Sequence, residues 1–161
     1  MTRDPKEARV QARALRMLAA RPRSAAELAS ALRRKGIEEP VVDRVVEWCG
    51  RLGYVDDDRF AEEYIRGRLA RNPQGRRRLE QELLARGIPR DTVKRHLDRL
   101  APQEEEDERC LAAARAGAVR YRDLAPEVRK RRLLGYLMRR GFTPETALRA
   151  VAQVDTDFRA D

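Results

Sequence analysis

The apolar residues of this chain recur with the spacing of amphipathic helices, and the pattern appears three times. Three segments end in a glycine, at positions 36, 87 and 141, roughly 50 residues apart. Leucines stand eight and four residues before each glycine: Leu28 and Leu32, Leu79 and Leu83, and Leu133 and Leu137. Leucines four apart share one helix face, and a glycine that follows them favours the left-handed conformation that ends a helix. Each segment is therefore predicted to be a helix with a glycine directly after its last turn.

A second helix is predicted after each glycine. Apolar positions fall there at i, i+3, i+4 and i+7, in three sets: Val42, Val45, Val46 and Cys49; Val93, His96, Leu97 and Leu100; Ala147, Ala150, Val151 and Val154. His96 is the only polar member, so we expect it at the edge of a packed face rather than in a ligand or catalytic site.

One more helix is predicted before each glycine-ended helix, over residues 6–20, 57–70 and 104–118. No segment shows the period-two alternation of a strand, so no sheet is predicted. The fold class is therefore all-α, with three tandem three-helix repeats forming a curved, elongated body. We expect the repeats at residues 1–55, 56–101 and 102–155, followed by a C-terminal tail at 156–161.

Signals for helix starts agree with this division. Ser24 and Glu27 have the spacing of a capping box, and Thr143 precedes a proline that suits the first helical position. The three consecutive aspartates 56–58 suggest a magnesium site, but no further ligands converge nearby. We interpret them as an N-cap followed by an acidic first turn.

Composition limits the classes of function. The chain has 161 residues, of which 39% are charged and 42% hydrophobic, and a net charge of +9. A basic surface of this size favours polyanionic partners, nucleic acid above all. No stretch approaches the roughly 20 apolar residues of a membrane span, and the N-terminus lacks a signal-peptide pattern. We expect a soluble, cytoplasmic protein without membrane contact.

The sequence predicts no catalytic or metal site and no cofactor. Cys49, Cys110 and the single histidine, His96, do not supply the four ligands of a zinc site, so both cysteines are expected to be buried. Serines are too scarce for a nucleophile and base pair, and no phosphate-binding glycine motif is present. The acidic run at 104–108 is interpreted as a solvated helix start. The chain is therefore expected to bind a partner rather than to catalyse a reaction.

Two clusters of basic residues form the predicted binding surface. The first lies around the central turn between two helices and contains Arg66, Arg68, Arg71, Arg76, Arg77 and Arg78; the second contains Arg129, Lys130, Arg131 and Arg132. Such clusters bind phosphates or an acidic protein groove. The alternative is that these residues are simply solvated.

The segment GYVDDDRFAEEYIRGRL, residues 53–69, resembles the central signature of the RecX family, the bacterial regulators of the RecA recombinase. The segments GRRRLEQELLARGI (75–88) and RRGF (139–142) resemble recurrent elements of the same family. The structural signature comprises Gly36, Tyr54, Asp57, Phe60, Tyr64, Gly87, Gly141 and Phe142. We interpret Tyr54, Asp57, Phe60 and Tyr64 as capping and core residues, not as contacts.

The resemblance implies tandem three-helix repeats and a role in DNA recombination, DNA repair and the SOS response. The implied partner is the RecA filament on single-stranded DNA, in whose groove such a protein inhibits ATP hydrolysis and strand exchange without a catalytic centre. A monomer is expected, and direct contact with single-stranded DNA stays open. The main alternative is a general DNA-binding module that uses a basic helix such as residues 76–86. A nucleic-acid enzyme would require metal-dependent cleavage that is lost on changing Asp57 or Asp58.

Overall fold

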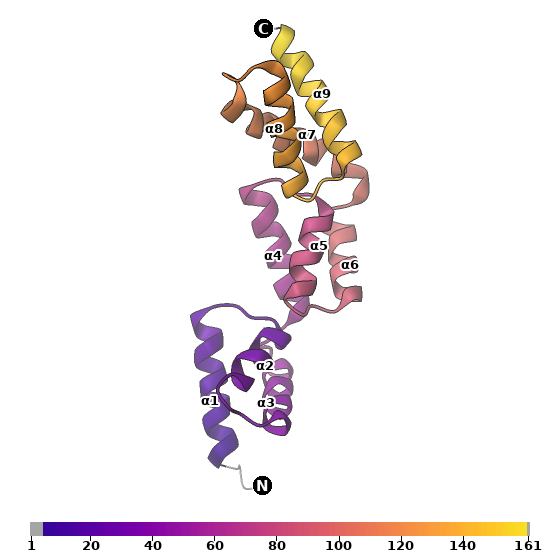
Figure 1. Cartoon of the computed structure of the whole chain (residues 1–161). Helices are drawn as coiled ribbons and strands as arrows, with labels where there is room; N and C mark the ends of the chain where they lie inside the picture. The colour runs from indigo at the N-terminus through magenta and orange to yellow at the C-terminus, as the bar shows by residue number, and fades with distance from the viewer. Residues whose placement is uncertain (1–4, 161) are drawn as a thin grey trace. The chain divides into compact units, whose positions relative to one another are not determined.

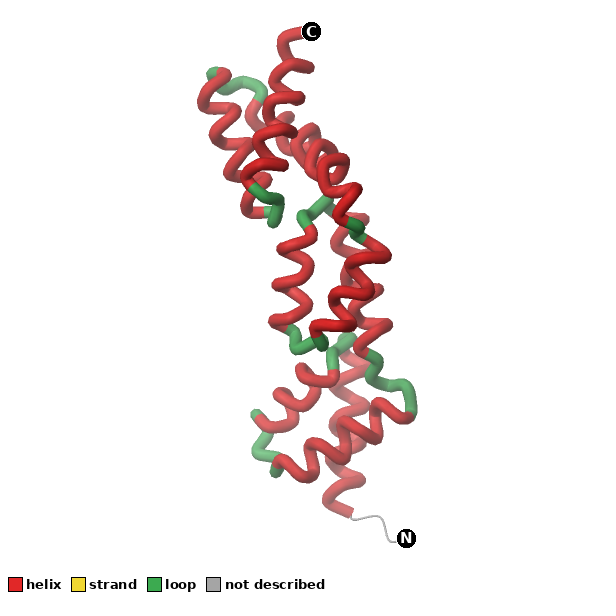
Figure 2. Tube along the Cα trace, turned by 90° about the vertical axis from the view of Figure 1, so that its right-hand side faces the viewer, coloured by secondary structure: helices red, strands yellow, loops and turns green. Residues whose placement is uncertain are grey.

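The computed structural model describes residues 5–160, with side chains to residue 156. Within this range the chain forms nine α-helices and two short 3-10 helices, and no strand (Figures 1 and 2). The elements are α1 (Pro5–Ala20), α2 (Ala25–Arg33), α3 (Glu39–Arg51), α4 (Asp57–Arg71), α5 (Arg76–Ala85), α6 (Arg90–Leu100), η1 (Gln103–Glu105), α7 (Glu106–Ala118), η2 (Val119–Tyr121), α8 (Pro126–Arg139) and α9 (Pro144–Ala160). The predicted all-α class and helix count are confirmed.

The helices divide into two compact units, and each contains part of the middle repeat. The first unit comprises the residues up to Glu62 together with Leu83–Val93, and the second comprises Glu63–Glu82 together with the residues from Lys94 onward. The helices α4, α5 and α6 each run through the division.

The core of the first unit lies between α1, α2 and α3. Its buried residues are Ala14, Leu28, Ala29, Leu32, Val42, Val45, Cys49 and Val55. Five of them, Leu28, Leu32, Val42, Val45 and Cys49, are positions that the helical periodicity selects. Burying one leucine or valine completely contributes about 1.5–3 kcal/mol. Cys49 is fully buried, as predicted.

The core of the second unit lies between α7, α8 and α9 and also includes Phe142. Small residues on α7, among them Ala113, Ala114 and Gly117, let its neighbours approach closely. A Cβ atom added at Gly117 would overlap the ring of Tyr136 on α8. Cys110 on the same helix is fully buried, as predicted.

The three glycines that were predicted to follow the last turn of a helix adopt the left-handed conformation. Their φ angles are +74° at Gly36, +76° at Gly87 and +87° at Gly141. The next amide closes the motif: that of Ile88 donates to the Leu83 carbonyl at 3.2 Å, and that of Phe142 donates to the Leu137 carbonyl at 3.4 Å. This arrangement satisfies carbonyl groups that the helix itself leaves without donors.

The predicted helix starts are also confirmed. The Ser24 hydroxyl accepts from the Glu27 amide at 3.0 Å, and the Glu27 carboxylate accepts from the Ser24 amide at 3.4 Å. The Asp56 carboxylate accepts from the Arg59 amide at 3.0 Å, which makes Asp56 the N-cap of α4. Thr143 accepts in the same way from the Thr146 amide at 3.2 Å.

The structure also bears on membrane spans, on metal sites and on the position of His96. None of the helices in the described range has the length and apolar character that crossing a bilayer requires. Over the same range, no group of three or more His, Cys, Asp or Glu side chains is placed to hold a metal ion. His96 is buried with the packed face of α6, and its Nδ1 lies 3.2 Å from the Arg99 guanidinium.

Candidate binding site: the arginine clusters and the joints between repeats

In the central basic cluster, Arg68 and Arg78 are held by one carboxylate. Glu82 on α5 accepts from the Tyr64 hydroxyl at 2.7 Å and lies 3.2 Å from Arg68 and 3.0 Å from Arg78. Burial raises the pKa of Glu82, but the hydrogen bonds from Tyr64 and Arg78 and the charges of Arg68 and Arg78 together outweigh it and hold the pKa below its usual value. Arg68 also lies over the Tyr64 ring, 5.1 Å from its centroid. These contacts connect α4 to α5 within the second unit.

Arg76 has a structural role at the start of α5. Its guanidinium pairs with Asp98 and donates to the Ala101 carbonyl at 3.2 Å. Its backbone amide donates to the buried carboxylate of Glu106 at 3.2 Å, and Glu106 also accepts from Arg109 at 2.6 Å. The hydrogen bonds from Lys94 and Arg76 lower the pKa of Asp98. Arg76 therefore joins α5, α6 and α7 and leaves only a fifth of its side chain exposed.

The rest of the central cluster faces solvent. Arg66, Arg71 and Arg77 are exposed. Arg71 and Arg77 have no ion partner among the residues that the structure describes. Because α4 and α5 are helices, neighbouring arginines point in different directions, and only some meet a carboxylate on the next helix.

The second basic cluster divides in the same way. Arg129 lies 3.1 Å from Asp155 and is 13% exposed, and Lys130 lies 3.4 Å from the same carboxylate. Arg131 and Arg132 are exposed and have no ion partner within the described range. The assignment of both clusters to a binding surface stays a prediction, and the structure concentrates the available charge on Arg71, Arg77, Arg131 and Arg132.

The signature aromatic residues lie nearer the surface than we predicted. Tyr54 is 49% exposed and packs against Trp48 with ring centroids 6.0 Å apart, so the interpretation of Tyr54 as a core residue is wrong. Gly53, with φ of +72°, turns the chain there before it enters α4. Phe60 and Tyr64 are half-buried, and Phe60 lies beneath the guanidinium of Arg86 at 6.0 Å.

Asp57 caps a helix other than its own. Its carboxylate accepts from the Ala25 amide at 2.9 Å, at the start of α2. Burial is the main cause that raises the pKa of Asp57; the neighbouring charges of Asp56 and Asp58 raise it further, and the Ala25 amide opposes the shift. Sequence spacing could not reveal this contact, because the two residues are brought together only by the packing of the repeats.

Two equivalent joints connect consecutive repeats. Each links the start of the glycine-ended helix in one repeat to the glycine at the end of the corresponding helix in the next repeat. At the first joint, the Ser24 hydroxyl donates to the Arg86 carbonyl at 2.5 Å. At the second, the Gly75 amide donates to the Arg140 carbonyl at 2.8 Å. In each case the first residue is the one before a helix start, and the second directly precedes a left-handed glycine.

Each joint is too tight for a side chain at its glycine. A Cβ atom at Gly87 would overlap Ala26, and one at Gly141 would overlap Arg78. Gly36 has the same position in the first repeat, but nothing lies within 4 Å of the corresponding Cβ position. Positions 87 and 141 therefore require glycine for two reasons: the left-handed backbone conformation, and the lack of space for a Cβ atom at the joint.

An open cleft accompanies each joint. The first cleft, of about 410 Å³, is lined by Arg21, Arg23, Ala26, Glu27, Ser30, Arg34, Leu84, Ala85, Arg86 and Gly87. The second cleft, of about 420 Å³, is lined by Arg77, Arg78, Gln81, Glu82, Met138, Arg139, Gly141, Phe142 and Pro144. Except for Arg77 and Arg78, none of these arginines was among the predicted site residues, because the clefts combine segments far apart in the sequence.

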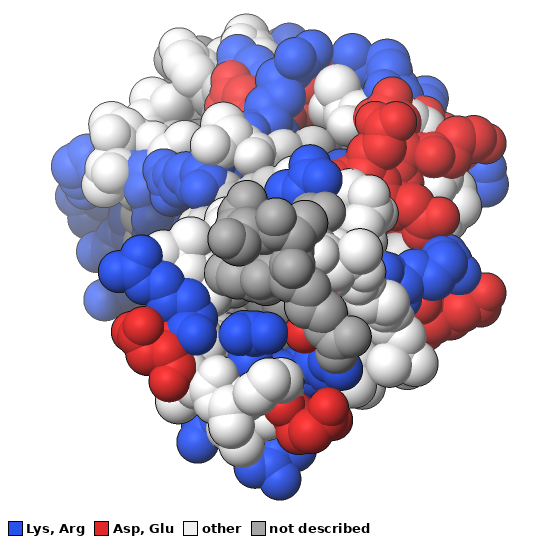
Figure 3. Space-filling view, turned by 90° about the horizontal axis from the view of Figure 1, so that it is seen from above, with Lys and Arg blue, Asp and Glu red and all other residues white. Residues whose placement is uncertain are grey.

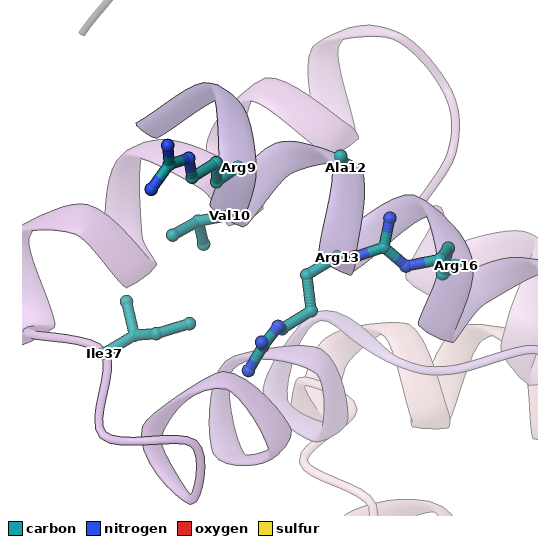
Figure 4. A pocket seen from close by; sticks show the side chains of 6 residues that line it. All are labelled: Arg9, Val10, Ala12, Arg13, Arg16 and Ile37. Atoms are coloured by element: carbon teal, nitrogen blue, oxygen red, sulfur yellow. The ribbon is translucent and has the colours of Figure 1, made fainter. Parts of the chain in front are cut away.

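A further cavity of about 430 Å³ lies along α1. Figure 4 shows Val10 and Ile37 facing the same space, with Arg9, Arg13 and Arg16 projecting from α1 around it. These arginines are exposed and have no ion partner in the part of the chain that the structure describes. Sequence analysis missed them, although their spacing of four and three residues is that of one helix face.

Basic side chains are therefore not confined to two clusters. In the view from above in Figure 3, Lys and Arg are distributed around the visible face, and Asp and Glu gather mainly on one side. These features define a helical-repeat protein whose available chemistry is the binding of acidic groups. The chain belongs to the RecX family of regulatory proteins, because three family models match it in succession.

The matches cover most of the chain. The models describe the first, second and third three-helix domains of RecX and match residues 12–49, 56–97 and 104–151, respectively. The chain is 41% identical to the regulatory protein RecX of Thermobifida fusca over 158 residues, which cover 94% of this chain and 84% of the relative. It is 36% identical to the regulatory protein RecX of Streptomyces coelicolor over 154 residues, with coverage of 94% and 79%.

The fold is similar to that of a solved structure. The crystal structure of RecX from Lactobacillus salivarius superposes with a TM-score of 0.76, at 20% identity, over 93% of this chain and 97% of that one. At that identity the comparison supports the three-repeat fold alone.

Proposed function

We propose that this protein regulates RecA by binding the RecA filament on single-stranded DNA in the cytoplasm, and that it restrains ATP hydrolysis and strand exchange without catalysing a reaction. Membership in the RecX family supports the choice of partner. The observation that carries the binding surface is that all three repeats contain exposed arginines, such as Arg13, Arg77 and Arg131, that have no ion partner among the described residues.

A protein that binds several subunits of a filament at once stabilises one filament geometry against others. Its effect on RecA is limited by the difference between its affinities for those geometries. Inhibition follows when the geometry that the protein binds best is not the one that supports strand exchange.

The test is a comparison of bare and RecA-coated single-stranded DNA. Binding of the protein is followed by fluorescence anisotropy at two salt concentrations, and ATP hydrolysis is measured in the same samples. We expect tighter binding to the coated strand, a weaker dependence on salt and slower hydrolysis. Equal or tighter binding to bare DNA with a steep salt dependence would contradict the proposal.

A paired set of variants tests the binding surface. Arg71→Gln combined with Arg77→Gln removes two charges that have no ion partner within the described range, and filament affinity is expected to fall. The control, Arg33→Gln combined with Arg51→Gln, removes two exposed charges that are paired with Glu39 and Glu47. The control should bind with nearly unchanged affinity. If both pairs lowered filament affinity equally, binding would depend on the net charge of the protein and not on a local surface around Arg71 and Arg77.

The second candidate function is general DNA binding, and the arginine face of α1 favours it. Arg9, Arg13 and Arg16 form a line of exposed charge on one helix, which suits a phosphate backbone. In that case changing these three residues to glutamine would abolish binding to bare DNA, and RecA would add nothing to the affinity.

A further inference from the structure

The two clefts are copies of one site. Counted back from the left-handed glycine of its own repeat, Ser30 in the first cleft has the position that Gln81 has in the second. On the opposite wall Leu84 corresponds in the same way to Met138, and Gly87 to Gly141. One wall therefore lies along a glycine-ended helix, and the other is the end of the next such helix.

The two clefts also hold similar sets of charges, although their glutamates have different positions in the repeat: Glu27 lies nine residues before Gly36, and Glu82 lies five residues before Gly87. Each holds one glutamate that is already neutralised: Glu27 pairs with Arg21 at 3.3 Å and with Arg86 at 2.7 Å, and Glu82 pairs with Arg78 at 3.0 Å. Each also contains two arginines without a carboxylate partner within the described range, which are Arg23 and Arg34 in the first cleft and Arg77 and Arg139 in the second. Both clefts thus have two positive charges available for a ligand.

The chemistry of the walls favours an acidic peptide over a phosphate backbone. Ala26 and Leu84 supply apolar surface in the first cleft, and Met138 and Pro144 supply it in the second. Apolar surface beside arginines suits a carboxylate on a peptide that also carries an apolar side chain.

We propose that both clefts bind the same acidic segment of the partner protein, taken from two copies of that protein. The proposal rests on the function proposed above, because a filament presents identical segments at regular intervals. Arg34 lies on one wall of the first cleft and Arg139 on the opposite wall of the second, and each provides an exposed guanidinium for the carboxylates of the segment.

Photocrosslinking from matched positions tests this. A benzoylphenylalanine is placed at Ser30 or at Gln81, one in each cleft, and at the exposed Asp43 outside both clefts as a control. Each variant is irradiated with RecA filaments on single-stranded DNA and ATPγS, and the linked peptides are identified by mass spectrometry. We expect positions 30 and 81 to yield one and the same acidic RecA segment, and position 43 not to yield it.

Anisotropy on the same samples separates the two proposals. Binding that persists while positions 30 and 81 link to DNA, to different segments or to nothing overturns the cleft proposal alone. Loss of preference for the filament in the unmodified protein overturns the proposed function. As a second test, Arg34→Glu and Arg139→Glu should each weaken filament binding by about tenfold, since each reverses a desolvated charge contact. The exposed Arg122→Glu should change it less than twofold, and equal effects of all three would also overturn the cleft proposal.

Discussion

Gly36, Gly87 and Gly141 share one backbone conformation but have different surroundings, and this difference separates two contributions to stability. All three have φ between +74° and +87°. An L-residue in this region costs about 1–2 kcal/mol. Only Gly87 and Gly141 also face another repeat at a distance that excludes a Cβ atom.

Alanine at each of these glycines should therefore have unequal effects. Gly36→Ala is expected to lower the free energy of unfolding by about 1–2 kcal/mol through backbone strain alone. Gly87→Ala and Gly141→Ala should each lose about 1–3 kcal/mol more, because the added methyl group overpacks a joint. Urea unfolding measures all three. Equal losses of unfolding free energy in all three variants would mean that the joints accommodate the added methyl group without destabilising the fold.

The two cysteines provide a prediction for pH dependence. Burial raises the pKa of Cys110 to about 12, with smaller contributions from Glu106 and Asp107, and burial also raises the pKa of Cys49. At pH 8 the thiolate fraction of Cys110 should be about 0.0001, compared with about 0.1 for an ordinary cysteine. Neither thiol should react with a disulfide reagent until the protein unfolds.

The same shifts make the folded state less stable in alkali. The unfolded chain releases its thiol protons near pH 9, whereas the folded chain keeps that of Cys110 until about pH 12. The cysteine contribution to stability is therefore complete below pH 9 and is lost as pH rises towards 12. Replacing both cysteines with alanine should reduce this alkaline loss, as followed by thermal unfolding. An unchanged loss would attribute it to other groups.

At the residue scale, local signals in the sequence were sufficient for caps and core positions. Ser24, Asp56 and Thr143 cap helices as predicted because a cap depends on residues within one turn of the chain. Tyr54 was misassigned because aromatic character alone does not reveal which side of a turn faces solvent. The contact between Asp57 and the Ala25 amide depends on packing and has no sequence signal.

At the scale of elements, Ser24 joins local and tertiary structure. Its hydroxyl caps α2 and also donates to the carbonyl of Arg86 at the end of α5. Ser24→Ala removes both contacts and leaves buried groups without partners, so we expect a loss of about 1–3 kcal/mol. Ser30→Ala is a matched control, because the Ser30 hydroxyl accepts from the exposed Arg34 guanidinium within the same helical turn and not from another repeat. Similar losses in both variants would show that the joint does not depend on this hydroxyl.

The charge pairs belong to this scale as well, and sequence analysis could not predict them. Adjacent arginines such as Arg76, Arg77 and Arg78 look equivalent in the sequence. In the structure Arg76 meets Asp98, Arg78 meets Glu82, and Arg77 faces solvent. Periodicity identifies the helices, but the partner of each exposed face depends on how the helices pack. The site was therefore predicted as a basic region and not as individual contacts.

At the scale of the whole molecule, the repeats should respond to damage locally. In a tandem-repeat protein each repeat is stabilised mainly by contacts with the neighbouring repeats. The two compact units each contain one joint: the first holds the contact of Gly87 with Ala26, and the second that of Gly141 with Arg78. A change in one joint should thus affect one unit more than the other.

Native-state hydrogen exchange of two glycine variants tests this local response. Gly141→Ala strains the joint in the unit that contains α7, α8 and α9, so amides in those helices should exchange faster while those of α1, α2 and α3 keep their protection. Gly87→Ala should give the reverse, since its joint lies with α1, α2 and α3. Because both variants add the same methyl group in the same backbone conformation, each is the control for the other. Uniform acceleration along the chain in both would mean that the three repeats open as one cooperative block.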